Sequence, residues 1–257
     1  LNYQHQLNHK YIFHSHLMKE SVIKKVYIKK LTKISGFKVW IVNGKYIRGN
    51  IDREFTNYGQ YYRFRFIPKD EFWIDKENNP GEARYFIDTM FIMNRLLSKG
   101  MDYKSARKIA NRIEKRERSK SKLIQKHIGI KKNKGDIFKS VYKELIKEYS
   151  KGKIKVWIVN GELVRGLFFL DFTEGGHDKV YSFIPSNEIW LDDDLDPSEI
   201  KFVLLHEVHE RNLMSKGMGY EKAHKSSSEI EYYCRKHPEK LDKYLMKEFK
   251  KAKKIKE

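Results

Sequence analysis

The sequence predicts an α+β protein of two tandem repeats, each a small antiparallel sheet followed by a helix hairpin, with basic flanking helices. Three observations predict this fold. The chain matches itself at a fixed offset, each copy begins with short β-rich runs separated by turn residues, and each copy ends with apolar residues at helical spacing. A chain of 257 residues is long enough for two small domains with modest cores.

The internal repeat is a gapless match along most of each copy. Residues 38–44 read Lys-Val-Trp-Ile-Val-Asn-Gly, and residues 155–161 read the same, which sets the offset at 117 (155 − 38). The same offset aligns Trp73 with Trp190 in the middle of the domain. Because one register holds over so many positions, the sequence indicates a duplication.

The repeats and their flanks divide the chain into five predicted segments. These are a basic helical lead-in (1–35), a first repeat (36–116), a charged linker or helix (117–152), a second repeat (153–238) and a basic C-terminal helix (239–257).

Within the second repeat, the local pattern changes from strand to helix. The β-rich runs are 156–159, 163–165, 167–172, 180–184 and 188–191. Asn160-Gly161 between the first two runs favours a hairpin, because a type I′ turn needs positive φ at both central residues. Asp196-Pro197 is typical of a helix start, and the spacing predicts a helix to about Gly217. A second helix is predicted over 220–236, before Pro238.

The two copies differ most in the polar residues of their helices. Reading from the second copy to the first, the replacements are His206 by Thr89, Glu207 by Met90, His209 by Ile92, Glu210 by Met93, His224 by Arg107, Glu229 by Arg112 and His177 by Gln60. Several replacements are apolar, so we expect a semi-buried helix face. Buried carboxylates need a partner, and a metal ion is one that would serve several of them. The first repeat is therefore interpreted as a degenerate copy.

Helical spacing predicts how the polar residues of the second copy would meet. His206 and Glu210 are four residues apart on one helix face, and a hairpin would bring His224 back towards them. Together they predict a three-ligand metal site with an open position for water. Glu207, one residue along, would be the general base. Two histidines and a carboxylate suit zinc, and Fe(II) is an alternative.

Other residues could join this site. His177, His209 and Glu229 are further candidates, and Glu231 ranks below His224 because the first copy retains it as Glu114. The alternative interpretation is a helix face whose charges are satisfied by local salt bridges, for instance to Arg211.

The segment also resembles a known family. Glu188-Ile189-Trp190-Leu191-Asp192, the Asp-Pro helix start and Phe202-Val203-Leu204-Leu205-His206-Glu207 resemble the strand–helix core of zincin metallopeptidases of the ImmA/IrrE type. In that family the helix bears His-Glu-x-x-His, a third ligand follows on the next helix, and the substrates are transcriptional repressors. The resemblance covers residues 188–238 and implies zinc-dependent cleavage of a peptide or protein. This chain departs from the family pattern at Glu210, which makes the motif His-Glu-x-x-Glu.

Composition leaves a second function open. The net charge is +20, with 54 basic and 34 acidic residues, which favours nucleic acid or another anionic partner. A non-catalytic module that binds nucleic acid or protein is therefore the main alternative, and a metal-dependent hydrolase of nucleic acid is a third. Cys234 is the only cysteine, which fits an intracellular location, cytoplasmic or phage-associated. No apolar run reaches the roughly 18 residues that a membrane span needs, so no membrane partner is expected.

Overall fold

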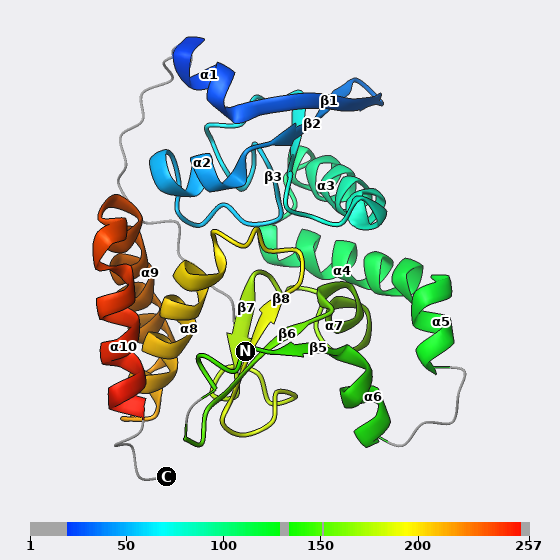
Figure 1. Cartoon of the computed structure of the whole chain (residues 1–257). Helices are drawn as coiled ribbons and strands as arrows, with labels where there is room; N and C mark the ends of the chain where they lie inside the picture. Colours follow the sequence, from blue (N-terminus) through cyan, green and yellow to red (C-terminus); the bar gives the residue numbers. More distant parts are fainter. Residues whose placement is uncertain (1–19, 129–133, 151, 253–257) are drawn as a thin grey trace.

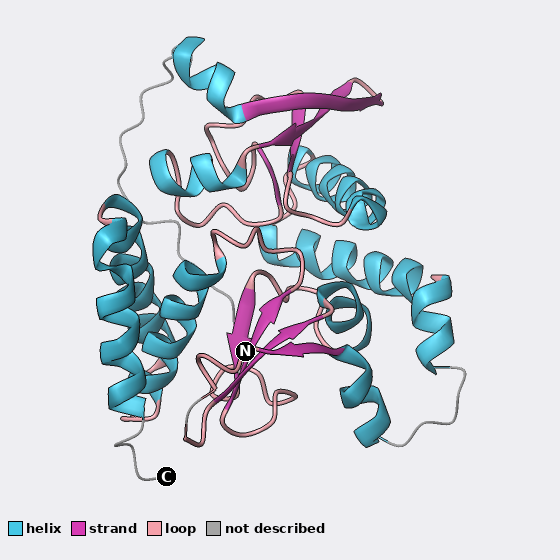
Figure 2. Ribbon diagram, in the orientation of Figure 1, coloured by secondary structure: helices cyan, strands magenta, loops and turns pink. Residues whose placement is uncertain are grey.

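The computed structural model describes residues 20–128, 134–150 and 152–252, and it has two four-stranded sheets, each followed by helices. Figure 1 shows the first repeat above the second, with α4 running between the two sheets and α8, α9 and α10 standing beside the second sheet. Figure 2 shows the same division into strands and helices. The α+β class and the two tandem repeats predicted from the sequence are confirmed.

The elements follow the same order in both repeats. The first repeat contains α1 (Glu20–Val26), β1 (Tyr27–Ile34), β2 (Phe37–Val42), α2 (Gly44–Asn50), β3 (Tyr58–Gln60), β4 (Glu71–Asp75), the 3-10 turn η1 (Pro80–Glu82), α3 (Ala83–Ser98) and α4 (Tyr103–Ser119), and α5 (Lys122–Ile128) follows it. The second contains α6 (Lys134–Val141), β5 (Tyr142–Leu145), β6 (Lys155–Val159), α7 (Gly161–Leu167), β7 (Gly175–His177), β8 (Glu188–Asp192), α8 (Ile200–Met214), α9 (Tyr220–Lys236), η2 (Pro238–Lys240) and α10 (Leu241–Ala252).

Both sheets are mixed, where the sequence predicts antiparallel ones. The strand orders are β1-β2-β4-β3 and β5-β6-β8-β7, and in each the two central strands are parallel. A helix and an edge strand lie between these two strands along the chain, so the chain re-enters the sheet in its original direction. The registers coincide, since Trp40 pairs with Trp73 and Trp157 pairs with Trp190.

The predicted Asn-Gly hairpin is wrong. Asn160 caps helix α7, and its side-chain oxygen accepts a hydrogen bond from the Leu163 amide at 2.8 Å. Gly161 has no positive φ; it is required because a Cβ there would collide with the carboxylate of Asp192. The dipeptide thus marks a close approach of the backbone to an acid, and residues 163–165 are helical instead of extended.

Two further predictions of local structure differ from the structure. Strand β1 lies in the predicted helical lead-in and β5 in the predicted linker, and each pairs with the next strand of its own repeat. Tyr27 in β1 and Tyr142 in β5 are 115 residues apart (142 − 27), so the gapless offset of 117 does not align them. The predicted strands 167–172 and 180–184 are wrong, because these segments form the end of α7, turns and irregular loops, and the edge strand is β7. The rest of the lead-in, residues 1–19, lies outside the described residues.

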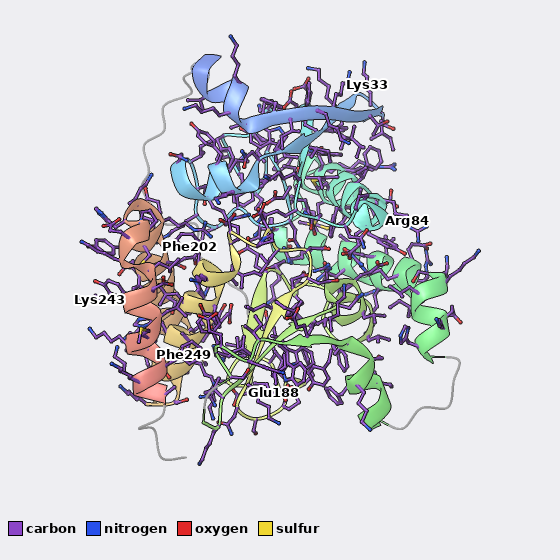
Figure 3. The ribbon with its side chains drawn as sticks, viewed as in Figure 1. Lys33, Arg84, Glu188, Phe202, Lys243 and Phe249 are labelled. Carbon is purple, nitrogen blue, oxygen red and sulfur yellow. The ribbon has the colours of Figure 1, made fainter. Side chains whose placement is uncertain are left out.

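Helix α8 is enclosed, and this burial sets the environment of its polar residues. Every residue from 203 to 212 is buried, because the helix contacts β7, β8, α9 and α10. Phe202 of α8 and Phe249 of α10, labelled in Figure 3, pack against the apolar cluster beneath these helices. Polar side chains of α8 therefore need partners inside the protein.

Buried arginines join the repeats through pairs of equivalent contacts. Arg165 binds Asp192 of its own repeat and Glu82 of the first repeat. Arg48, its counterpart 117 residues earlier, binds Asp75 at 2.7 Å and, across the interface, Glu199 at 3.3 Å. Since each arginine binds an acid of its own repeat and an acid of the other, the repeats are related by an approximate two-fold arrangement.

Breaking one of these buried pairs is expected to destabilise the fold. Arg165→Ala leaves Glu82 and Asp192 buried with a missing partner, which costs about 3–5 kcal/mol of unfolding free energy. Urea unfolding measures this loss. The control is Arg116→Ala, which removes an arginine whose side chain is 69% exposed and should change stability by less than about 0.5 kcal/mol. Equal effects of the two substitutions would contradict a structural role for the buried pair.

Candidate metal centre

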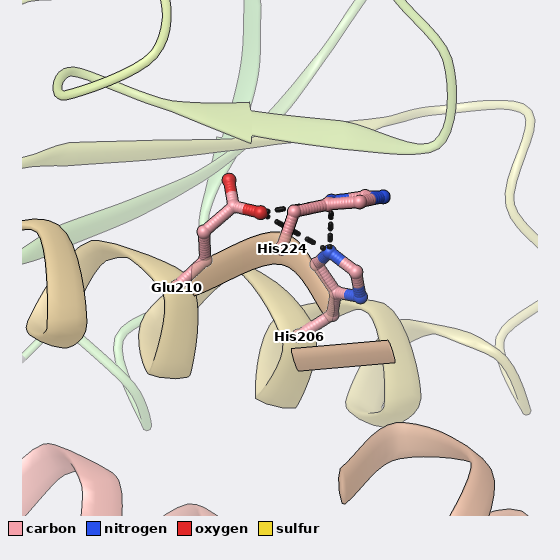
Figure 4. Close-up of side chains that lie close together, drawn as sticks. All are labelled: His206, Glu210 and His224. Atoms are coloured by element: carbon pink, nitrogen blue, oxygen red, sulfur yellow. Dashed lines mark hydrogen bonds and ion pairs between the residues drawn. The ribbon is translucent and has the colours of Figure 1, made fainter. Parts of the chain in front are cut away.

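The helix hairpin α8–α9 brings His206, Glu210 and His224 together (Figure 4). His206 and Glu210 lie one turn apart on α8, and Gly217, with a φ of 88°, allows the tight turn that returns the chain into α9. His206 Nε2 is 3.1 Å from His224 Nδ1, and Glu210 Oε2 is 2.8 Å from His224 Nδ1 and 3.6 Å from His206 Nε2. The three polar atoms thus face one point.

These separations suit a single cation. Ligand atoms about 2.0–2.1 Å from a tetrahedral zinc ion lie roughly 3.3 Å from one another. The three observed separations, 2.8, 3.1 and 3.6 Å, bracket that value. Two imidazoles and a carboxylate also form a ligand set that zinc or Fe(II) accepts. The residues present therefore fit the predicted metal.

The His206 ring is held by a carboxylate on its other side. Its Nδ1 is 2.9 Å from Glu231 Oε2, and Glu231 is in turn paired with Arg235 at 2.7 Å. A ligating histidine in a metalloprotein usually donates its second N–H to such a carboxylate, which directs the free nitrogen at the metal. Glu231 thus lies where it orients His206. The first repeat retains the same acid as Glu114, which there accepts a hydrogen bond from Thr89 at 2.7 Å.

His177 on β7 lies beside the cluster formed by His206, Glu210 and His224, but its hydrogen bonds give it a different role. Its Nδ1 accepts the Lys179 backbone N–H at 3.2 Å, so in the neutral ring Nε2 carries the hydrogen. That nitrogen is 3.1 Å from Glu210 Oε1, to which it donates. Burial lowers the pKa of His177, which favours this neutral form. His177, Glu207 and Glu210 could also hold a cation. The hydrogen bond from Lys179, however, favours His177 as a hydrogen-bond donor that orients Glu210 over a role as a metal ligand.

The charges of the cluster are strongly coupled. Burial opposes charge on Glu210, yet its close contacts with the rings of His177, His206 and His224 hold its pKa far below the usual range. Burial likewise opposes charge on His224, but its hydrogen bond with Glu210 and the nearby carboxylate of Glu54 raise its pKa to about 9. The pKa of His206 is also raised, because its contacts with Glu210 and Glu231 outweigh burial. Without a metal, protons therefore occupy the cluster at neutral pH.

Glu207 faces a small polar cavity next to these residues. The cavity has a volume of about 100 Å³, and His206, His224 and Glu174 also line it. Glu207 is only 9% exposed, and burial raises its pKa to about 8, helped by Glu210 and opposed by His206. Among the described residues, none forms a hydrogen bond with the Glu207 carboxylate. Glu207 is thus a buried acid at the cavity wall, with a pKa close to neutral pH.

Two acidic residues of the cavity, Glu174 and Glu54, were not predicted from the sequence. Glu174 has a φ of 59°, a left-handed conformation that is uncommon for glutamate, and burial raises its pKa to about 7. Glu54 comes from the first repeat, and its carboxylate is 3.7 Å from His224 Nε2. The only sequence signal for Glu54 is that its counterpart at the offset of 117, Asp171, is also acidic.

Two predicted candidates lie away from the cluster. His209 is buried on another side of α8, where Nε2 is 3.0 Å from Ser226 Oγ and Nδ1 is 3.2 Å from Glu248. Glu229 is exposed on α9. Neither lines the cavity. His209 and Glu229 lie away from the cluster because adjacent positions along a helix point about 100° apart around its axis.

Comparisons of the chain with models of protein families, with curated proteins and with solved structures give no match. The resemblance to zincin metallopeptidases therefore rests on the sequence motif, and it stays a prediction. Among the helices of the described residues, none is long and apolar enough to cross a lipid bilayer.

Zinc binding is expected to release protons and to strengthen as pH rises. The pKa of His224 is about 9 and that of His206 is raised as well, so protons compete with the metal at pH 7. Each released proton makes the affinity rise about tenfold per pH unit, so loss of the His224 proton alone predicts a gain of about tenfold per unit below pH 9. Calorimetric titration with ZnCl₂ in two buffers of different ionisation enthalpy counts these protons.

The control for this titration is His209→Ala, which removes a histidine of the same helix that does not line the cavity. It should leave both the proton count and the pH dependence unchanged. A zinc affinity that is the same from pH 6 to pH 8 would contradict the predicted competition.

Proposed function

We propose that this protein is a metal-dependent hydrolase, zincin-like in its ligand arrangement, that cleaves peptide bonds. The proposal rests mainly on one observation. Three polar atoms of His206, Glu210 and His224 lie 2.8–3.6 Å from one another, which brackets the separation of ligands around one tetrahedral cation. The carboxylate of Glu207 lines the cavity beside them. Zinc is the favoured metal, and Fe(II) is the alternative.

Each residue of the site has a separate role in the proposed hydrolysis. A zinc ion held by His206, Glu210 and His224 would supply a Lewis acid that polarises a carbonyl group and acidifies water. Glu207, which lines the same cavity, would accept a proton from this water and return it, as a general base and acid must. Glu231 and His177 hold the ligands in orientation.

The acidity of the cavity favours a peptide over a nucleic acid as the substrate. Glu54, Glu174, Glu207 and Glu231 line it together with Arg53 and Arg235, so acidic side chains outnumber arginines at the point where the charge of a phosphodiester would sit. The net charge of +20 for the whole chain describes its overall field, which attracts anionic partners without selecting the group that enters the cavity. A neutral amide enters without this repulsion.

The role of Glu207 can be tested without altering a proposed ligand. Glu207→Gln keeps the size of the side chain but removes its ability to accept a proton. We expect the variant to retain zinc and to cleave about 10²- to 10⁴-fold more slowly than the unmodified chain. The probe is a library of quenched fluorescent peptides, incubated with the zinc-loaded full chain. Zinc content is measured by elemental mass spectrometry.

Two results would overturn the proposal. One is zinc-loaded protein that cleaves no member of the peptide library, and the other is a Glu207→Gln variant as active as the unmodified chain. A fluorescent single-stranded oligonucleotide, run in parallel, separates the substrate classes: its cleavage in place of the peptides would assign the site to nucleic acid hydrolysis.

A further inference from the structure

The metal cluster touches the first repeat through His224, and that contact has an equivalent elsewhere in the fold. His224 Nε2 lies 3.7 Å from the carboxylate of Glu54. At the positions related by the offset of 117, Arg107 Nη2 lies 2.6 Å from the carboxylate of Asp171. In each case the second helix of one repeat's hairpin reaches an acid of the other repeat.

The two contacts differ in what their basic residue can do. Arg107 carries a permanent charge and no lone pair for a metal, so its contact with Asp171 is an ion pair alone. His224 has two ring nitrogens, and each faces a carboxylate from a different repeat: Nδ1 is 2.8 Å from Glu210 and Nε2 faces Glu54. When Glu54 accepts the Nε2 hydrogen, the lone pair of His224 is on Nδ1, which points into the cluster.

The surroundings of His206 support this assignment of the His224 tautomer. Glu231 lies 2.9 Å from His206 Nδ1, opposite the nitrogen that faces the cluster. Glu54 occupies the matching position behind His224, and its 3.7 Å separation lies within about 1 Å of a hydrogen bond. The Glu54 side chain is 44% exposed, so it has room to close this distance.

We propose that the first repeat completes the metal centre, with Glu54 as the positioning residue that fixes the tautomer and orientation of His224. This inference rests on the metal binding in the proposed function and extends it to the first repeat. Arg53 and Thr56 from the same loop also line the cavity, so the degenerate repeat supplies part of the cavity wall in addition to the scaffold.

The test measures zinc affinity in the full chain, by competition with a chelator. Glu54→Ala should weaken zinc binding by about 10- to 100-fold, as loss of a carboxylate behind a ligating histidine does. Glu54→Gln retains an oxygen that accepts the Nε2 hydrogen, so it should restore most of the affinity. The matched control is Asp171→Ala, which breaks the equivalent contact outside the cavity and should leave zinc affinity unchanged.

A second readout separates positioning from stability. The visible spectrum of the cobalt-loaded protein reports the ligand geometry, and it should change in Glu54→Ala but not in Asp171→Ala, even where both variants lose a similar amount of thermal stability. Zinc affinity in Glu54→Ala equal to that of the unmodified chain, or equal losses in both alanine variants, would overturn this inference alone. An unmodified chain that binds no zinc would overturn the proposed function as well.

Discussion

A continuous series of buried ion pairs links the first repeat to the cluster of His206, Glu210 and His224 in the second. Arg48 of the first repeat binds Glu199, Glu199 binds Arg235, Arg235 binds Glu231, and Glu231 holds the ring of His206. Each of these charges is largely removed from water, so each must keep its partner. Because α8 and α9 contribute to the same series, the hairpin cannot shift without leaving a buried charge unpaired. The proposed ligands therefore gain their fixed orientation from the contact between repeats.

The duplication separates what the fold requires from what the site requires. Glu114 and Arg118 of the first repeat form the same buried pair as Glu231 and Arg235 of the second. The residues that face the cluster differ, however, and the first repeat fills the same helix face with side chains that are buried and carry no charge, namely Thr89, Met90 and Met93. The charged network is thus common to both copies, and the proposed chemistry belongs to one. The first repeat still lies against the cavity through Glu54.

Much of the second repeat could be predicted because its signals are local. The bounds of α9 agree with the prediction, and His206 and Glu210 meet because helical spacing alone places them on one face. Interactions distant in the sequence could not be predicted. Gly161 is needed for the approach of Asp192, which lies 31 residues away (192 − 161), and Glu54 reaches His224 from the other repeat. The sequence does not predict strand β1, because its lysines lie on an exposed edge of the sheet. A charged strand at such an edge has the same composition as a charged helix.

The most direct test of the central claim is the X-ray absorption spectrum of the protein loaded with one equivalent of zinc. The account predicts a first shell of nitrogen and oxygen atoms at about 2.0–2.1 Å, with the outer-shell scattering of two imidazole rings. In His206→Ala one imidazole should be lost from this shell. A spectrum with no imidazole scattering, or one that His206→Ala leaves unchanged, would contradict the metal centre.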